Sequence, residues 1–101
     1  MQRRIQVNKD QLGDFCRRHH IAKLSFFGSI LREDFTADSD IDVLVDFEAG
    51  HTPGLLRIAQ LERELSFLLQ NRKVDLRTSQ DLSRYFRKQV LATAEVQYAQ
   101  G

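Results

Sequence analysis

The sequence GSILREDFTADSDIDVLVDF, residues 28–47, places two aspartates at the start of an apolar run. Side chains alternate between the two faces of a β-strand, so Asp40 and Asp42 are expected to lie on the same face. Carboxylates this close repel each other unless a cation lies between them. Mg²⁺ is such a cation, because it typically takes one or two protein carboxylates together with substrate phosphates. The stretch therefore predicts a strand whose first residues bind a metal and a nucleotide.

A glycine and a serine upstream suit the phosphates of that nucleotide. Gly28 and Ser29 are separated from Asp40 by ten residues. A Gly-Ser turn offers backbone N–H groups and a hydroxyl, which bind phosphate oxygens. Arg32 is equally suited to a phosphate or to a local contact with the acidic loop that follows it. Ser39 is typical of a turn and is the remaining candidate for a contact with the nucleotide.

A third acidic residue, Asp75, lies between apolar neighbours in a strand predicted at 72–78. If that strand pairs with the strand that carries the aspartate pair, three carboxylates converge on one metal cluster, as in two-metal phosphoryl transfer. One of the three can also accept the acceptor's proton as a general base. The alternative is an exposed residue in an ion pair with Lys73 or Arg77, which is common on protein surfaces. Beside the upstream motif, the catalytic interpretation is favoured.

The hydrophobic periodicity predicts alternating helices and strands. The expected elements are a helix from Asn8 (capped with Gln11) to near His20, strands at 21–27, 40–47 and 72–78, a short helical turn at 29–34, a loop at 35–39, a helix from Thr52-Pro53 to Leu69 with Leu55 in its apolar stripe, and a last helix capped by Ser79 or Ser83. Val96 and Tyr98 near the end of the chain are expected to pack against the core. This order predicts one α/β domain, residues 1–101, in which helices flank a small sheet.

Composition narrows the function classes. Fifteen Lys and Arg residues against fourteen Asp and Glu residues give a net charge of +1, so direct nucleic-acid binding is not expected. The sequence shows neither an apolar run of membrane-spanning length nor a signal-peptide core. The single cysteine, Cys16, fits a reducing compartment, and we expect a cytoplasmic protein. The three histidines have no zinc-ligand spacing with Cys16, so no zinc site is expected.

The composite motif resembles a known family. The pattern Gly-Ser-x10-Asp-x-Asp that starts at Gly28, with a later strand carboxylate at Asp75, resembles the signature of polymerase-beta-type nucleotidyltransferases. The small size, Arg32 and the Ser-Asp-Ile-Asp sequence further resemble the minimal nucleotidyltransferase (MNT) domains, which are typically antitoxins of HEPN/MNT toxin–antitoxin pairs. The resemblance covers residues 20–80 and implies a polymerase-beta-like fold with a small mixed sheet flanked by helices.

The resemblance also implies roles for the motif residues. Mg²⁺ would be held by the three catalytic carboxylates, Asp40, Asp42 and Asp75, and the Gly-Ser pair would bind the triphosphate of ATP. AMP would be transferred to a tyrosine hydroxyl of a HEPN-type toxin, an RNase that the modification silences. One departure is Glu33, where many relatives carry glycine. Its charge weakens nucleotide binding unless the side chain points away from the phosphates.

Two other functions are compatible with the sequence. An antitoxin could neutralise its toxin by binding alone, an alternative that Glu33 and the aromatic C-terminal segment motivate. Transfer of a nucleotide to a small molecule such as an aminoglycoside would need an acceptor site that a dimer cleft could supply. Larger nucleotidyltransferases hold the acceptor with a second domain, so we expect a partner protein or a second copy of the chain to hold it here, in a homo- or hetero-oligomer.

Overall fold

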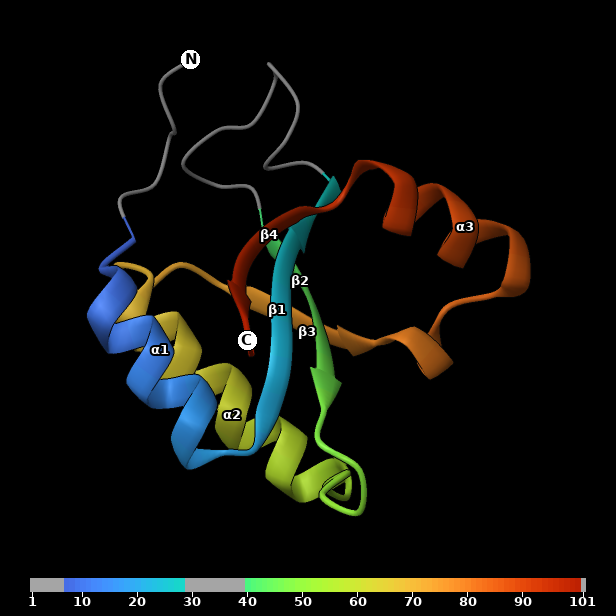
Figure 1. Ribbon diagram of the computed structural model, residues 1–101. Coiled ribbons are helices and arrows are strands. Elements are labelled where there is room, and N and C mark those ends of the chain that lie inside the picture. Colours follow the sequence, from blue (N-terminus) through green and yellow to red (C-terminus); the bar gives the residue numbers. More distant parts are fainter. Residues whose placement is uncertain (1–6, 29–39, 101) are drawn as a thin grey trace.

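A four-stranded sheet in the order β3-β2-β1-β4 forms the centre of the protein (Figure 1). The computed structural model describes residues 7–28 and 40–100. The strands are β1 (Ile21–Phe27), β2 (Ile41–Phe47), β3 (Val74–Thr78) and β4 (Glu95–Ala99). β1 pairs antiparallel with β2 and with β4, whereas β2 pairs parallel with β3. The small mixed sheet expected from the sequence is confirmed.

In the described part of the chain, three α-helices cover the sheet: α1 (Lys9–Arg18), α2 (Leu55–Leu68) and α3 (Arg84–Thr93), with a 3₁₀ turn, η2 (Ser79–Asp81), after β3. Figure 1 shows α1 and α2 together on one side of the sheet and α3 on the other. Among the described residues, the helices are too short or too polar to cross a lipid bilayer.

Local capping signals decide where two of the helices begin. Asn8 Oδ1 accepts a hydrogen bond from Gln11 N at 3.0 Å, which confirms the predicted cap of α1. Ser83 Oγ accepts one from Phe86 N at 3.2 Å, so Ser83 caps α3. The start predicted for α2 is wrong, because that helix begins after an extended residue, Gly54. The fixed φ of a proline suits both helical and extended backbone, so the preceding Thr-Pro pair did not define the boundary.

The main core lies between the sheet and the α1–α2 layer. Its buried side chains are Leu12, Phe15, Cys16, Ile21, Leu24, Phe26, Ile41, Val43, Val45, Leu61, Leu65, Leu69, Val74 and Leu76. The predicted apolar face of β2 is therefore confirmed. Leu55 departs from the predicted stripe of α2, because it is 88 % exposed at the first position of the helix. A second, smaller cluster on the other face joins Phe27 and Leu44 to Leu82 and Val90.

The strand β4 was not predicted, because the expected last element was a helix. β4 lies at an edge of the sheet beside β1, with a register shift between Leu24 and Ser25. Val96 is consequently 46 % exposed, against the expectation that it packs, and Gln97 is buried. Lys9 Nζ donates to Gln97 Oε1 at 2.9 Å and satisfies this buried amide oxygen. Tyr98 packs against the main core as expected.

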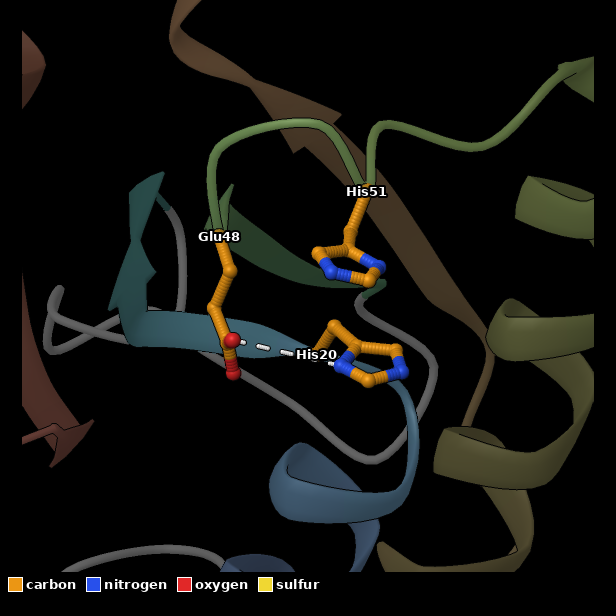
Figure 2. Close-up of side chains that lie close together, drawn as sticks. All are labelled: His20, Glu48 and His51. Atoms are coloured by element: carbon orange, nitrogen blue, oxygen red, sulfur yellow. Dashed lines mark ion pairs between the residues drawn. The ribbon is translucent and has the colours of Figure 1, made fainter.

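The hairpin end that contains the start of β1 and the end of β2 is closed by backbone hydrogen bonds. Glu48 N donates to His20 O at 2.8 Å, and His51 N donates to Glu48 O at 3.0 Å. His20 and Gly50 have positive φ values of 58° and 81°. These values allow tight turns in the connection before β1 and in the loop after β2. The side chains of His20, Glu48 and His51 lie close together as a result (Figure 2).

Candidate active site

The parallel pairing of β2 with β3 places two of the predicted catalytic carboxylates side by side. Asp42 and Asp75 are direct register partners, and Ile41 is the partner of Val74. Ile41 and Val74 are both buried in the main core, so the two aspartates extend from the opposite face of the sheet. Backbones of adjacent strands lie about 4.8 Å apart, which brings the two carboxylates within reach of one cation. The condition set by the sequence, that these strands be neighbours, is met.

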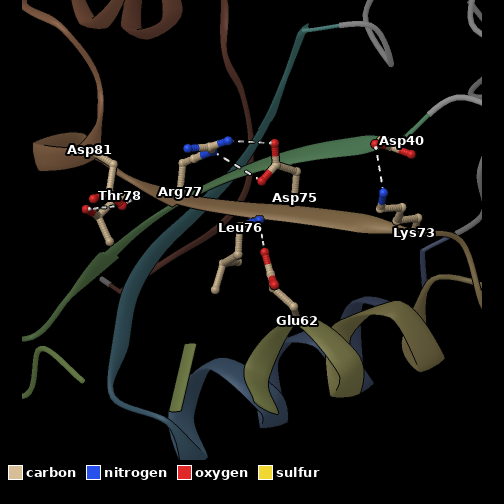
Figure 3. A network of polar contacts seen from close by, with 8 residues as sticks. All are labelled: Asp40, Glu62, Lys73, Asp75, Leu76, Arg77, Thr78 and Asp81. Carbon is tan, nitrogen blue, oxygen red and sulfur yellow. Dashed lines mark hydrogen bonds and ion pairs between the residues drawn. The ribbon is translucent and has the colours of Figure 1, made fainter. Parts of the chain in front are cut away.

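Asp40, the third predicted carboxylate, lies immediately before β2. Ile41 N donates to Lys73 O at 2.8 Å, and this bond begins the contact between the two strands. The Asp40 carboxylate lies 3.9 Å from Lys73 Nζ, and its side chain is 47 % exposed (Figure 3). Asp40 is therefore close to the ends of both strands that carry the other two aspartates.

Arg77 binds Asp75 through both of its carboxylate oxygens. The Nε–Oδ1 and Nη2–Oδ2 distances are 3.1 and 3.2 Å, and Figure 3 shows both side chains on the side of β3 away from α2. The pKa of Arg77 is raised, first by this hydrogen bond and then by the Asp75 charge, with smaller contributions from Asp81 and Asp42. The ion pair that the sequence analysis weighed as an alternative is thus present. The ion pair is partly exposed, and the Asp75 carboxylate lies at the surface. A metal ion can therefore still reach this carboxylate.

Gly28 allows the Asp42 side chain to lie against the end of β1. Its φ is +73°, and an added Cβ would lie 2.2 Å from Asp42 Oδ2. Phe27, the preceding residue, is the register partner of Asp42. The glycine of the motif therefore provides space for a candidate metal ligand, a role additional to the predicted phosphate contact. The other predicted nucleotide-binding residues, Ser29, Arg32 and Ser39, lie outside the described residues, as does Glu33.

Two polar contacts that sequence reasoning missed hold the strands of the site. Glu62 Oε2 on α2 accepts a hydrogen bond from Leu76 N at 2.8 Å and ties the edge strand β3 to that helix (Figure 3). Ser79 Oγ donates to Asp46 Oδ1 at 2.9 Å and ties η2 to the end of β2. Asp46 is half-buried in this contact. Neither contact could be read from local sequence, because each joins residues far apart in the chain.

The arrangement fits a hard divalent cation. Its donors are carboxylate oxygens from the start of β2 and from β3, which are the ligand type that Mg²⁺ prefers. Asp40, Asp42 and Asp75 would hold the ion. Two of the three carboxylates face a lysine or an arginine in the structure, which offsets part of their mutual repulsion.

The match to a protein family covers nearly all of the described chain. Residues 9–96, from α1 into β4, match the model of the nucleotidyltransferase domain. The chain belongs to the nucleotidyltransferase family. It is 40 % identical over 74 residues to the protein adenylyltransferase MntA of Thermococcus cleftensis, a match that covers 73 % of this chain and 72 % of that protein.

Solved structures agree with this assignment. One solved structure, that of a minimal nucleotidyltransferase, has 36 % sequence identity to this nucleotidyltransferase. The two superpose with a TM-score of 0.69, and the match covers 87 % of this chain and 85 % of that chain. A crystal structure of a toxin–antitoxin with AMP-PNP matches with a TM-score of 0.73 over 92 % of this chain and 74 % of that chain. At a sequence identity of 20 %, this match is evidence for the fold alone. The resemblance to minimal nucleotidyltransferases, the fold and the enzyme class expected from the sequence are confirmed.

Proposed function

We propose that this nucleotidyltransferase is an Mg²⁺-dependent antitoxin that transfers AMP from ATP to a tyrosine hydroxyl of a HEPN-type toxin. The observation that carries the proposal is the register pairing of Asp42 with Asp75, with Asp40 beside them. The name of the relative from Thermococcus cleftensis, protein adenylyltransferase MntA, supports a protein acceptor. The toxin–antitoxin structure with AMP-PNP supports a toxin partner and an adenine nucleotide.

In the proposed reaction, the hydroxyl oxygen of the acceptor attacks the α-phosphorus of ATP. The new O–P bond joins AMP to the toxin, the bond between the α-phosphorus and the bridging oxygen breaks, and pyrophosphate leaves. One of the three carboxylates accepts the proton of the hydroxyl. A bound divalent cation supplies positive charge that stabilises the phosphates in the transition state. The Gly28-Ser29 pair would bind the triphosphate, and Asp42, which lies against Gly28, would be close to the reacting α-phosphate.

The proposal is tested by incubating the chain with α-labelled ATP, Mg²⁺ and a HEPN-type toxin as the acceptor. Asp42→Asn is expected to lower label transfer by at least about 100-fold, the scale of a lost catalytic group. Asp46→Asn is the matched control, because it makes the same chemical change four residues farther along the same face of β2 and keeps an oxygen that can accept from Ser79 Oγ. Equal labelling by the Asp42→Asn variant and the wild type would refute catalysis by this site. Mass spectrometry of the product, with a Tyr→Phe toxin, identifies the acceptor.

Neutralisation of the toxin by binding alone is the second candidate. Exposed apolar side chains favour it: Leu55, Leu56, Phe67, Phe86, Leu91 and Val96 are between 46 % and 88 % exposed. Such residues are available for contact with a partner. If the Asp42→Asn, Asp75→Asn double variant protects cells from the toxin as well as the wild type does, binding is sufficient. If the variant still forms the complex but no longer protects, catalysis is required. Labelling of an aminoglycoside in place of the toxin would indicate a small-molecule acceptor.

A further inference from the structure

Two histidines and a glutamate meet at the hairpin end remote from the candidate active site. His20 directly precedes β1, and Glu48 directly follows β2, with His51 three residues farther on. Six residue steps along β1 separate this end from Phe27, the partner of Asp42. At about 3.3 Å per residue, the two sites are roughly 20 Å apart. The cluster is therefore separate from the carboxylates of the nucleotidyltransferase site.

The potential ligand atoms of the three side chains lie within 4.8 Å of one another. The rings of His20 and His51 are stacked, with centroids 3.9 Å apart and an angle of 15° between their planes. His20 Nδ1 lies 3.9 Å from Glu48 Oε1, as Figure 2 shows. Ligand atoms around a tetrahedral Zn²⁺ at 2.0–2.2 Å are about 3.4 Å apart. The stacked rings are nearly parallel, so their in-plane nitrogen lone pairs do not yet converge on one point. Rotation of at least one ring, with a closure of up to about 1.4 Å, would complete the geometry, and the exposed histidines have side-chain torsions that allow this.

The backbone holds the three attachment points together without a metal. The hydrogen bond from Glu48 N to His20 O joins the two segments, and the bond from His51 N to Glu48 O closes the turn that carries His51. Gln100 Nε2 donates to Glu48 Oε2 at 3.3 Å, so the second carboxylate oxygen has its own partner from the C-terminal segment. This contact is typical of the outer groups that orient a metal-binding carboxylate.

We propose that His20, Glu48 and His51 bind Zn²⁺ or a divalent transition metal of similar chemistry. Two imidazoles and one carboxylate suit such ions, whereas Mg²⁺ prefers oxygen ligands alone. Three protein ligands leave at least one position for water. The bound ion joins the α1–β1 connection to the loop after β2 and stabilises the folded chain, because the unfolded chain lacks the assembled site. Local spacing did not indicate this site, since its ligands come from two segments more than 25 residues apart in sequence.

Nitrogen-15 NMR of the imidazoles during a Zn²⁺ titration tests the proposal, with excess Mg²⁺ present to occupy the carboxylate site. The signals of His20 and His51 are expected to shift together and to saturate at one Zn²⁺ per chain. His19 is an internal control. Its side chain is 8 % exposed and is held between Arg57 and Glu64 at 2.9 and 2.8 Å, so its signals should stay unchanged. Shifts of all three histidines alike, or of none, would overturn the proposal.

Variants identify the ligands. His51→Gln and Glu48→Gln are expected to abolish the saturable shift and the rise in thermal midpoint that Zn²⁺ produces. His51 lies in an exposed loop, so its variant is expected to fold. The Asp42→Asn, Asp75→Asn double variant is expected to bind Zn²⁺ as the wild type does. An unchanged Zn²⁺ response in His51→Gln, or its loss in the double aspartate variant, would show that the histidines only stack and that the ion binds elsewhere.

Discussion

Gly28 and Asp42 are in such close contact that no side chain fits at position 28: an added Cβ would lie 2.2 Å from Asp42 Oδ2. The motif glycine lies at the end of β1 and the aspartate in the neighbouring strand. The spacing of the signature thus reflects a direct contact between its first residue and one of its last. Gly28 also has a φ of +73°, so two independent constraints require glycine there.

Gly28→Ala is expected to displace the Asp42 carboxylate and to lower nucleotidyl transfer by about 100-fold, because a shift of about 1 Å in a reacting group has effects of that size. Gly50→Ala is the matched control. Gly50 has a φ of +81° but no heavy atom within 4 Å of an added Cβ. Both variants should lose about 1–2 kcal/mol of stability through the left-handed backbone. Equal transfer rates in the two variants would contradict the role assigned to the contact.

Arg77→Gln is expected to increase the affinity for Mg²⁺ in the absence of nucleotide, measured by calorimetry. The guanidinium binds both oxygens of Asp75, so it competes with a cation for that carboxylate. The pair is partly exposed, and its loss should cost less than about 1 kcal/mol of stability. Arg63→Gln makes the same charge change on α2, on the opposite face of the sheet. Weaker Mg²⁺ binding by Arg77→Gln than by this control would show that Arg77 supports the metal site.

Glu62→Ala is expected to lower the free energy of unfolding in urea by about 1–2 kcal/mol, because the N–H of Leu76 loses its acceptor. Glu62→Gln keeps an amide oxygen at the same position and should lose less. The contrast separates the hydrogen bond from the packing of the side-chain stem. If Glu62→Ala is as stable as Glu62→Gln, the N–H of Leu76 obtains a replacement partner from water. The contact with Glu62 then does not hold β3 in place.

Cys16 is expected to resist alkylation while the chain is folded. Its side chain is fully buried, and burial raises the pKa of the thiol to about 12, so the reactive thiolate is scarce at pH 8. Labelling with iodoacetamide, followed by mass spectrometry, should be slow in buffer and fast in urea. Equal rates under the two conditions would mean that α1 opens readily from the sheet.

Acid is expected to destabilise the fold partly through His19. Its pKa is lowered, mainly by burial and also by Arg57 and Arg18, against an opposing effect of Glu64. The unfolded chain therefore takes up a proton near pH 6.5 before the folded chain does, and stability falls as the pH drops through that value.

His19→Gln should weaken this dependence when unfolding free energies at pH 7.5 and 5.5 are compared. His20 and His51 are present in both proteins, so their contributions cancel in the comparison. An unchanged difference between the two pH values would exclude His19 as a source of the acid sensitivity.

The sequence by itself determined the features that depend on near neighbours in the chain. Alternation along β2 placed Ile41, Val43 and Val45 in the core and Asp42 on the opposite face, because successive side chains of a strand point to opposite sides. The cap at Asn8 was predictable for the same reason, since its partner is three residues away. The composite motif was specific enough to indicate the nucleotidyltransferase family.

The tertiary structure decided every relationship between distant segments. The pairing of Asp42 with Asp75, the contact of Gly28 with Asp42, the addition of β4 and the meeting of His20 with His51 all depend on which strands pair and in which register. Local periodicity specifies the buried face of a strand but not its neighbour. The sequence therefore provided the candidate carboxylates, and strand pairing brought them together.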